Sequence, residues 1–142
     1  MKKYSKEEIE TTLEKIDCAI DRPVKIVVIG GSAAVLKYDV VEATKDIDYI
    51  DDSPSLEQLL KNTGLTFDIP IEKVNVYDAP WNYQERLIKE ESLELSNLNV
   101  FYPEVHDLIL MKSIRSNEND LQMIEEICKN NKVSSKISKR KG

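Results

Sequence analysis

The apolar run Ile26–Ile29 ends directly in Gly30-Gly31-Ser32, and this junction narrows the choice of folds more than any other part of the chain. The run is short and rich in β-branched residues, so it predicts a buried strand over Lys25–Ile29. Two adjacent glycines and a serine predict a turn, and Ala33–Tyr38 predicts a short helix after it. The chain is therefore expected to contain a strand–turn–helix unit.

The remaining hydrophobic pattern predicts a mixture of helices and strands. Apolar residues at helical spacing over 6–20, after a capping box of Ser5 and Glu8, predict an amphipathic helix. We expect an α+β fold, a small mixed β-sheet flanked by helices. The other predicted elements are strands at Asp46–Ile50 and Glu72–Tyr77, helices that begin at Ser53-Pro54, Pro103 and Asn117, a short helical segment at Tyr83–Ile88, and a hairpin of Leu93–Leu95 with Leu98–Tyr102.

The length of 142 residues predicts one domain over 1–131, followed by a basic and disordered tail over 132–142. The tail either makes the chain more soluble or contacts RNA phosphates. The net charge of −6 excludes a broad basic face that coats nucleic acid. The apolar runs are too short to cross a membrane, and the polar N-terminus predicts a cytoplasmic location.

The residues Gly30, Gly31 and Ser32 have the chemistry of an anion site. Backbone N–H groups at the N-terminus of a helix bind phosphate, glycine lets the backbone approach a ligand closely, and Ser32 adds a hydroxyl donor. The pattern is neither a Walker loop nor the dinucleotide fingerprint GxGxxG. Taken alone, these three residues are better explained as a plain turn than as a phosphate site.

The next chemical signal is the pair Asp46 and Asp48. Residues two positions apart in a strand point to the same face, so the two carboxylates are expected to lie side by side. Adjacent carboxylates attract hard cations such as Mg²⁺, and pairs of such ions are common in phosphoryl chemistry. The alternative is an edge strand that keeps its polar face in water.

The order of turn, short helix and paired aspartates resembles the core pattern of the polymerase-beta-type nucleotidyltransferase superfamily. That pattern is a hydrophobic residue with Gly-Gly/Ser, a short spacer and Asp-hydrophobic-Asp, and it corresponds here to Ile29–Ser32, a spacer of thirteen residues, and Asp46–Asp48. Ala43–Asp48 is also similar to the ATxDID form of abortive-infection and toxin–antitoxin nucleotidyltransferases. The resemblance implies that Asp46 and Asp48 hold Mg²⁺ and that Gly30, Gly31 and Ser32 contact nucleotide phosphates.

The resemblance implies two further roles in the C-terminal part. Lys112, on the helix with Leu108, would reach the triphosphate, and Asp120 on the following helix would support the site. The residues themselves leave a second explanation open, because a lysine stem can run along an apolar surface to solvent.

The superfamily also uses a third carboxylate on a neighbouring strand, as a metal ligand or as the base. Asn75 stands where an aspartate would be expected, and Asp78 either replaces it as the third metal ligand or begins the turn before Pro80. Relatives often carry an arginine where this chain has Glu42. Both departures favour a protein that kept the fold and lost the chemistry.

The leading hypothesis is a Mg²⁺-dependent nucleotidyltransferase that binds an NTP such as ATP and transfers an NMP to a hydroxyl group on RNA, including tRNA, or on a protein. Asp46, Asp48 and Lys112 would carry the catalysis, within a toxin–antitoxin or phage-defence system. The alternative is an inactive binding module that acts through a protein partner. The short chain also suggests that a cognate toxin or antitoxin, or a second copy in a homodimer, completes the site.

Overall fold

The computed structural model describes residues 3–41, 44–51, 56–74, 80–115 and 118–131, with the backbone alone for 112–115 and 118–121. This part of the chain confirms the predicted α+β class. No described helix has both the length and the apolar character needed to cross a membrane. The elements in chain order are α1 (Lys6–Ala19), β1 (Val24–Ile29), α2 (Gly30–Lys37), β2 (Ile47–Asp51), α3 (Leu56–Thr63), β3 (Ile71–Lys73), η1 (Tyr83–Arg86), β4 (Ile88–Lys89), β5 (Leu98–Tyr102), α4 (Val105–Arg115) and α5 (Glu118–Asn130).

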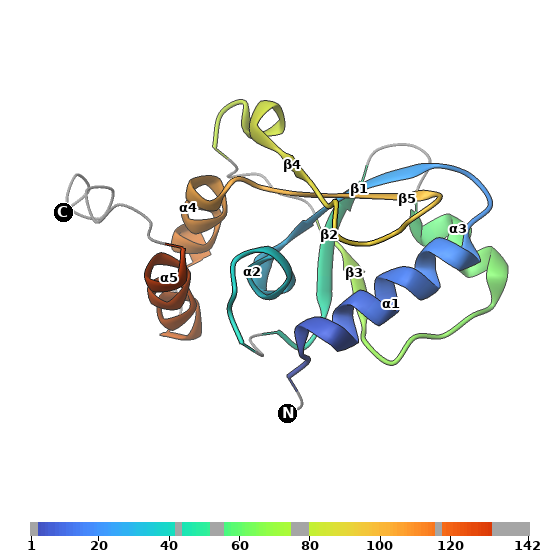
Figure 1. Cartoon of the computed structure of the whole chain (residues 1–142), viewed down its shortest axis with the longest axis horizontal. Helices are drawn as coiled ribbons and strands as arrows, with labels where there is room; N and C mark the ends of the chain where they lie inside the picture. Colours follow the sequence, from blue (N-terminus) through green and yellow to red (C-terminus); the bar gives the residue numbers. More distant parts are fainter. Residues whose placement is uncertain (1–2, 42–43, 52–55, 75–79, 116–117, 132–142) are drawn as a thin grey trace.

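The described strands form one mixed sheet in the order β3-β2-β1-β5-β4. β1 pairs antiparallel with β2 and parallel with β5, while β3 runs parallel to β2 and β4 runs antiparallel to β5. Parallel neighbours need a crossover connection, and α3 lies in the connection from β2 to β3. In Figure 1, α1 and α2 lie together against the sheet, α4 and α5 lie side by side on the left, and α3 lies on the right.

Alternation along β1 divides the apolar residues between the two faces of the sheet. Val24, Ile26 and Val28 face the main core, which the sheet forms with the helices around α1 and α2. Val27 and Ile29 face the other way and pack with Tyr83 and Met111, which we call the second apolar cluster. The η1 segment and α4 therefore cover part of the sheet face opposite α1.

The predicted hairpin of Leu93–Leu95 with Leu98–Tyr102 is wrong. Leu98–Tyr102 forms β5, but β5 pairs with β1 and β4, and none of the described residues 90–97 forms a strand. The loop before β5 is instead bonded to the buried carboxylate of Asp17, which accepts N–H bonds of 2.9, 2.6 and 2.7 Å from residues 96, 97 and 98. The Asp17 carboxylate thus holds the segment in which a second hairpin strand was expected, and β4 is the antiparallel neighbour of β5 instead.

Two other predicted segments differ from the structure. The residues Gly30-Gly31-Ser32 form the first turn of α2 rather than a turn before it, because Gly30 adopts a positive φ of 64° at the junction. Ile88 belongs to β4, and only Tyr83–Arg86 is helical in that segment. The predicted tail over 132–142 and the predicted helix starts at Ser53-Pro54 and Asn117 lie outside the described residues.

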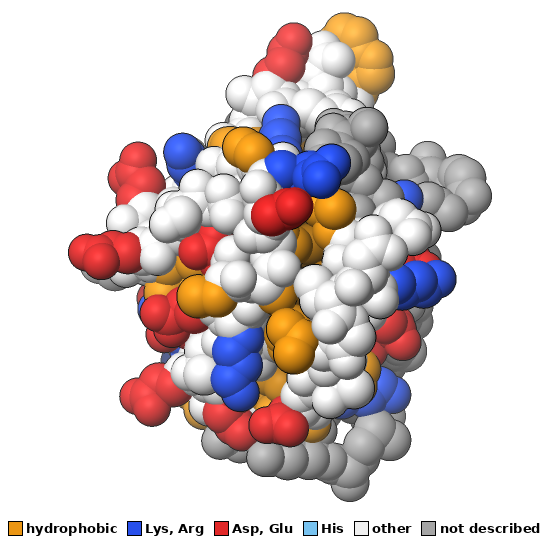
Figure 2. All heavy atoms as spheres, turned by 90° about the vertical axis from the view of Figure 1, so that its right-hand side faces the viewer, with side chains coloured by type: hydrophobic (Ala, Val, Ile, Leu, Met, Phe, Trp, Pro, Cys, Tyr) orange, Lys and Arg blue, Asp and Glu red, His pale blue; other side chains and the backbone are white. Residues whose placement is uncertain are grey.

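Figure 2 shows the side of the molecule that carries α3. Hydrophobic side chains reach this surface in small patches among acidic and basic side chains. A groove of about 340 Å³ lies between α3 and the start of β3, with Leu60, Phe67 and Pro70 among its lining residues. The described residues that line this groove include no cluster of catalytic groups.

Candidate metal and nucleotide site

Three carboxylates meet at one end of the sheet. Asp46 immediately precedes β2, Asp48 lies within β2, and Glu72 lies on β3. One carboxylate oxygen from each residue lies within 4.8 Å of the other two. Asp46 and Asp48 are partly exposed and Glu72 is exposed, so the group is open to a ligand from solvent. Three carboxylates at this spacing repel one another, and a hard divalent cation removes that repulsion.

The strand registers explain why these residues meet. Alternation places Asp46 and Asp48 on one face, as the sequence predicts. The parallel pairing of β2 with β3 sets Glu72 directly beside Asp48. Because parallel strands begin at the same edge of a sheet, a carboxylate near the start of β3 meets the carboxylates near the start of β2.

The N-terminus of α2 lies against this carboxylate group. The antiparallel pairing of β1 with β2 places Ile29 opposite Asp48, and α2 begins at the next residue. A methyl group added to Gly30 would lie only 3.3 Å from Oδ2 of Asp48. The first N–H groups of a helix have no acceptor within the helix, and the residue before α2 provides no side-chain cap. The helix start therefore offers backbone donors for an anion beside the carboxylates.

Ser32, the third residue of the predicted phosphate contact, has its hydroxyl bonded within the fold in this structure. Its side chain is fully buried, and its hydroxyl donates to the backbone oxygen of Ile29 at 3.1 Å. Gly30 and Gly31 are partly exposed. In this structure, the donors available to a phosphate at the helix start are thus backbone N–H groups rather than the Ser32 hydroxyl.

Gly30→Ala is expected to weaken divalent-metal binding as well as the fold. A non-glycine residue at positive φ costs about 1–2 kcal/mol, and the new methyl group would press on Asp48. Gly64 is the matched control, because its φ is 68° and an added methyl group meets nothing within 4 Å. Urea unfolding should show a similar loss of stability in both alanine variants, whereas Mn²⁺ titration should show weaker binding in Gly30→Ala only. Equal Mn²⁺ affinity in the two variants would contradict a role of the close contact between Gly30 and Asp48 in metal binding.

The backbone before Asp46 is held by Thr44. The Thr44 side chain is buried, and its hydroxyl donates to the backbone oxygen of Asp46 at 2.6 Å. The same hydroxyl accepts a longer bond of 3.4 Å from the backbone N–H of Asp46. These bonds fix the direction in which the chain enters β2 and therefore help to orient the Asp46 carboxylate.

The second apolar cluster lies on the same face of the sheet as the carboxylates. Residues that pair directly across a sheet project to the same face, and Ile29 of this cluster pairs with Asp48. The η1 segment is held over this face by Arg86, whose Nε and Nη2 donate to the two oxygens of Asp107 at 2.8 and 3.0 Å. Hydrogen bonding to Asp107 also raises the pKa of Arg86. The site thus has a rigid apolar border next to its charged end.

The remaining predicted site residues lie at the limits of the described structure. Lys112 is on α4 and Asp120 is on α5, and the structure gives the backbone alone at both positions. Both helices lie next to α2. Asp78, together with Asn75 and Glu42, lies outside the described residues.

Glu72 is the site residue that the sequence analysis missed. The sequence predicts a strand that begins at Glu72, but the superfamily pattern directs attention to Asn75 and Asp78 for the third carboxylate. The direction of β3 could have identified Glu72. In a parallel pair, the start of β3 lies beside the start of β2, where the two aspartates are.

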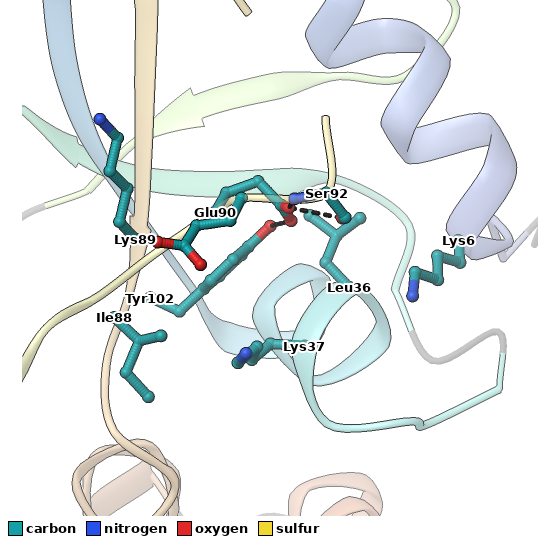
Figure 3. Close-up of a pocket in the computed structure, with 9 residues that line it drawn as sticks. Lys6, Leu36, Lys37, Ile88, Lys89, Glu90, Ser92 and Tyr102 are labelled. Carbon is teal, nitrogen blue, oxygen red and sulfur yellow. Dashed lines mark hydrogen bonds between the residues drawn. The ribbon is translucent and has the colours of Figure 1, made fainter. Parts of the chain in front are cut away.

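A second pocket, of about 370 Å³, lies at the opposite end of α2, around Leu36 and Lys37 (Figure 3). One of its carboxylates, that of Glu90, accepts bonds of 2.6 Å from the hydroxyl of Tyr102 and from both the backbone N–H and the hydroxyl of Ser92. Burial opposes ionisation of Glu90, but these bonds hold its pKa below the ordinary value. Glu90 thus serves the local fold, and the lysines of the pocket do not converge on one point. The candidate site is therefore the N-terminus of α2 together with the carboxylates of Asp46, Asp48 and Glu72.

A glycine-rich helix start beside paired aspartates at the start of β2, with a third carboxylate alongside, can hold a phosphate next to divalent cations, which is the chemistry of phosphoryl transfer. The chain belongs to the family described as Nucleotidyltransferase of unknown function (DUF6036), whose model matches residues 7–139. The prediction of a nucleotidyltransferase is therefore confirmed at the level of this class. No curated protein and no solved structure matches the chain.

Proposed function

We propose that this protein is a Mg²⁺-dependent nucleotidyltransferase that transfers an NMP from an NTP to a hydroxyl group. The observation that carries the proposal is the meeting of Asp46, Asp48 and Glu72 at the N-terminus of α2. An all-carboxylate donor set suits Mg²⁺ better than a soft metal, and the adjacent backbone N–H groups suit a phosphate. The family description supports the class of reaction.

In the proposed reaction, the acceptor oxygen bonds to the α-phosphorus, the bond from that phosphorus to the bridging oxygen breaks, and pyrophosphate leaves. Asp46 and Asp48 would hold the metal, and the start of α2 would orient the phosphates. A bound divalent cation supplies charge neutralisation at the phosphates. Glu72 is the most exposed of the three carboxylates, so it is the best placed to receive the proton of the acceptor hydroxyl. Lys112 is the proposed cation for the triphosphate, and Asp120 is proposed to support it.

The acceptor is proposed to be a hydroxyl group on RNA or on a protein. The similarity of Ala43–Asp48 to toxin–antitoxin enzymes adds a cognate protein partner to the proposal. A partner or a second copy of the chain is proposed to complete the acceptor-binding surface.

Calorimetric titration with each of the four common NTPs, with and without Mg²⁺, tests the proposal. We expect metal-dependent binding of at least one NTP to the wild type and at least about tenfold weaker binding to Asp46→Asn, because a metal ligand is lost. Asp39→Asn is the matched control, since Asp39 is exposed and adopts a positive φ that asparagine tolerates. A folded wild type that binds none of the NTPs would reject the enzyme and favour the partner-binding module, for which a pull-down is the next experiment.

A further inference from the structure

The two chain segments that carry the carboxylates are joined by a residue far from them in the sequence. The backbone N–H of Tyr4 donates to the backbone oxygen of Thr44 at 2.8 Å, two residues before Asp46. The hydroxyl of the same tyrosine donates to the backbone oxygen of Asp68 at 3.1 Å, four residues before Glu72. Tyr4 therefore links the segment that leads into β2 with the segment that leads into β3, and we call these two segments the approaches.

The position of Tyr4 is itself fixed by the start of α1. Ser5 caps this helix: its hydroxyl accepts the N–H of Glu8 at 3.3 Å, and the Glu8 carboxylate accepts the N–H of Ser5 at 3.1 Å. The capping box holds the backbone that immediately follows Tyr4. The tyrosine is thus anchored on α1, and the two approach segments are bonded to it.

The connection continues to the carboxylates through short steps. The backbone oxygen of Thr44 accepts the N–H of Tyr4, and the Thr44 hydroxyl donates to the backbone oxygen of Asp46. On the other side, Asp68 leads within two residues to Pro70, whose oxygen accepts the N–H of Ile47 at 2.8 Å. Among the described backbone contacts, this last bond and the first ladder pairs of β3 also hold the two segments together. The distance between the Asp46 and Glu72 carboxylates depends on how firmly the approaches are held.

We infer that Tyr4 is a positioning residue of the metal site, setting the spacing of Asp46 and Glu72 through the hydroxyl that reaches Asp68. This inference rests on the proposed function, because it assumes that the three carboxylates bind a divalent cation. Tyr4 touches neither metal nor substrate, and it acts through the backbone of two segments.

Mn²⁺ affinity, measured from the electron-paramagnetic signal of the free ion, tests the inference in the full chain. Tyr4→Phe removes the hydroxyl alone and keeps the ring and the backbone bond. We expect about threefold to tenfold weaker Mn²⁺ binding, at or below the 10–100-fold loss typical of groups that bond a metal ligand directly. Tyr38→Phe is the matched control, because the Tyr38 hydroxyl also donates to a backbone oxygen, that of Pro103, at 2.5 Å. Tyr38 lies at the C-terminal end of α2, so its loss should affect stability and leave Mn²⁺ binding unchanged.

The possible results separate the two proposals. If the wild type binds Mn²⁺ and Tyr4→Phe binds it with the same affinity, the positioning role is overturned and the proposed metal site still stands. Equal weakening in Tyr4→Phe and Tyr38→Phe also overturns it, because a general loss of stability would then be the cause. A folded wild type that binds no Mn²⁺ removes the metal site, and the inference is rejected with it.

Discussion

Glu72→Gln is expected to slow NMP transfer by roughly 100-fold or more, the usual effect of removing a group that transfers a proton in the rate-determining step. Glutamine keeps the size of the side chain and can still offer an oxygen to a metal, but it accepts no proton. Metal-dependent NTP binding should therefore fall less than the rate. The measurement is single-turnover transfer with saturating NTP, once an acceptor is in hand, beside calorimetric binding of the same NTP.

Two further variants make this prediction specific. Asp78→Asn tests the residue that the sequence leaves open as a replacement for the third carboxylate, and we expect this variant to transfer at the wild-type rate. Glu91→Gln controls for the loss of one negative charge, because Glu91 is exposed and lies in the pocket at the other end of α2. A slow Asp78→Asn beside an unaffected Glu72→Gln would assign the third carboxylate to Asp78 instead.

Asp17→Ala is expected to destabilise the fold by about 3 kcal/mol, which lowers the melting temperature by roughly 10 °C in a domain of this size. The buried carboxylate of Asp17 accepts three backbone N–H bonds from the loop that leads into β5. Alanine would leave the donors of Ser96, Asn97 and Leu98 without this acceptor. Urea unfolding measures the loss, and Asp21→Ala is the neighbouring control, because the Asp21 side chain is exposed and bonds the exposed Arg22.

The stabilisation by Asp17 should depend on pH in a defined direction. Burial opposes its ionisation, but the backbone N–H groups of Leu98, Ser96 and Asn97 hold the pKa of the carboxyl below its ordinary value. A carboxyl whose pKa is lower in the folded state stabilises the protein fully above its unfolded pKa of about 3.9. That contribution is lost as the pH falls through the folded pKa. The difference between wild type and Asp17→Ala should therefore be constant near neutral pH and shrink in acid, and a difference that grows in acid would contradict the assignment.

Much of the fold was predictable from local patterns. The capping box of Ser5 and Glu8 forms as predicted, and α1 begins at Lys6. The β-branched run gives β1 within one residue of its predicted start. These elements depend on contacts between residues close in the sequence, so their residue types carry enough information.

The errors share a physical cause. Gly30 and Gly31 have low helix propensity, so a turn was predicted, yet the chain needs a positive φ at Gly30 to pass from β1 into α2 beside Asp48. Leu93–Leu95 has the composition of a strand, but no ladder partner is free for it because β4 and β1 flank β5. In both places tertiary packing overrode local preference.

The same division holds for the site. The sequence by itself determined that Asp46 and Asp48 share one face of a strand and that a glycine-rich helix start precedes them, because alternation and the order of elements are local properties. Only the tertiary structure decided that Glu72 completes the carboxylate group and that Tyr4 joins the segments that carry it. Those contacts depend on the register of β3 against β2 and on hydrogen bonds between residues up to 64 positions apart, which no local pattern encodes.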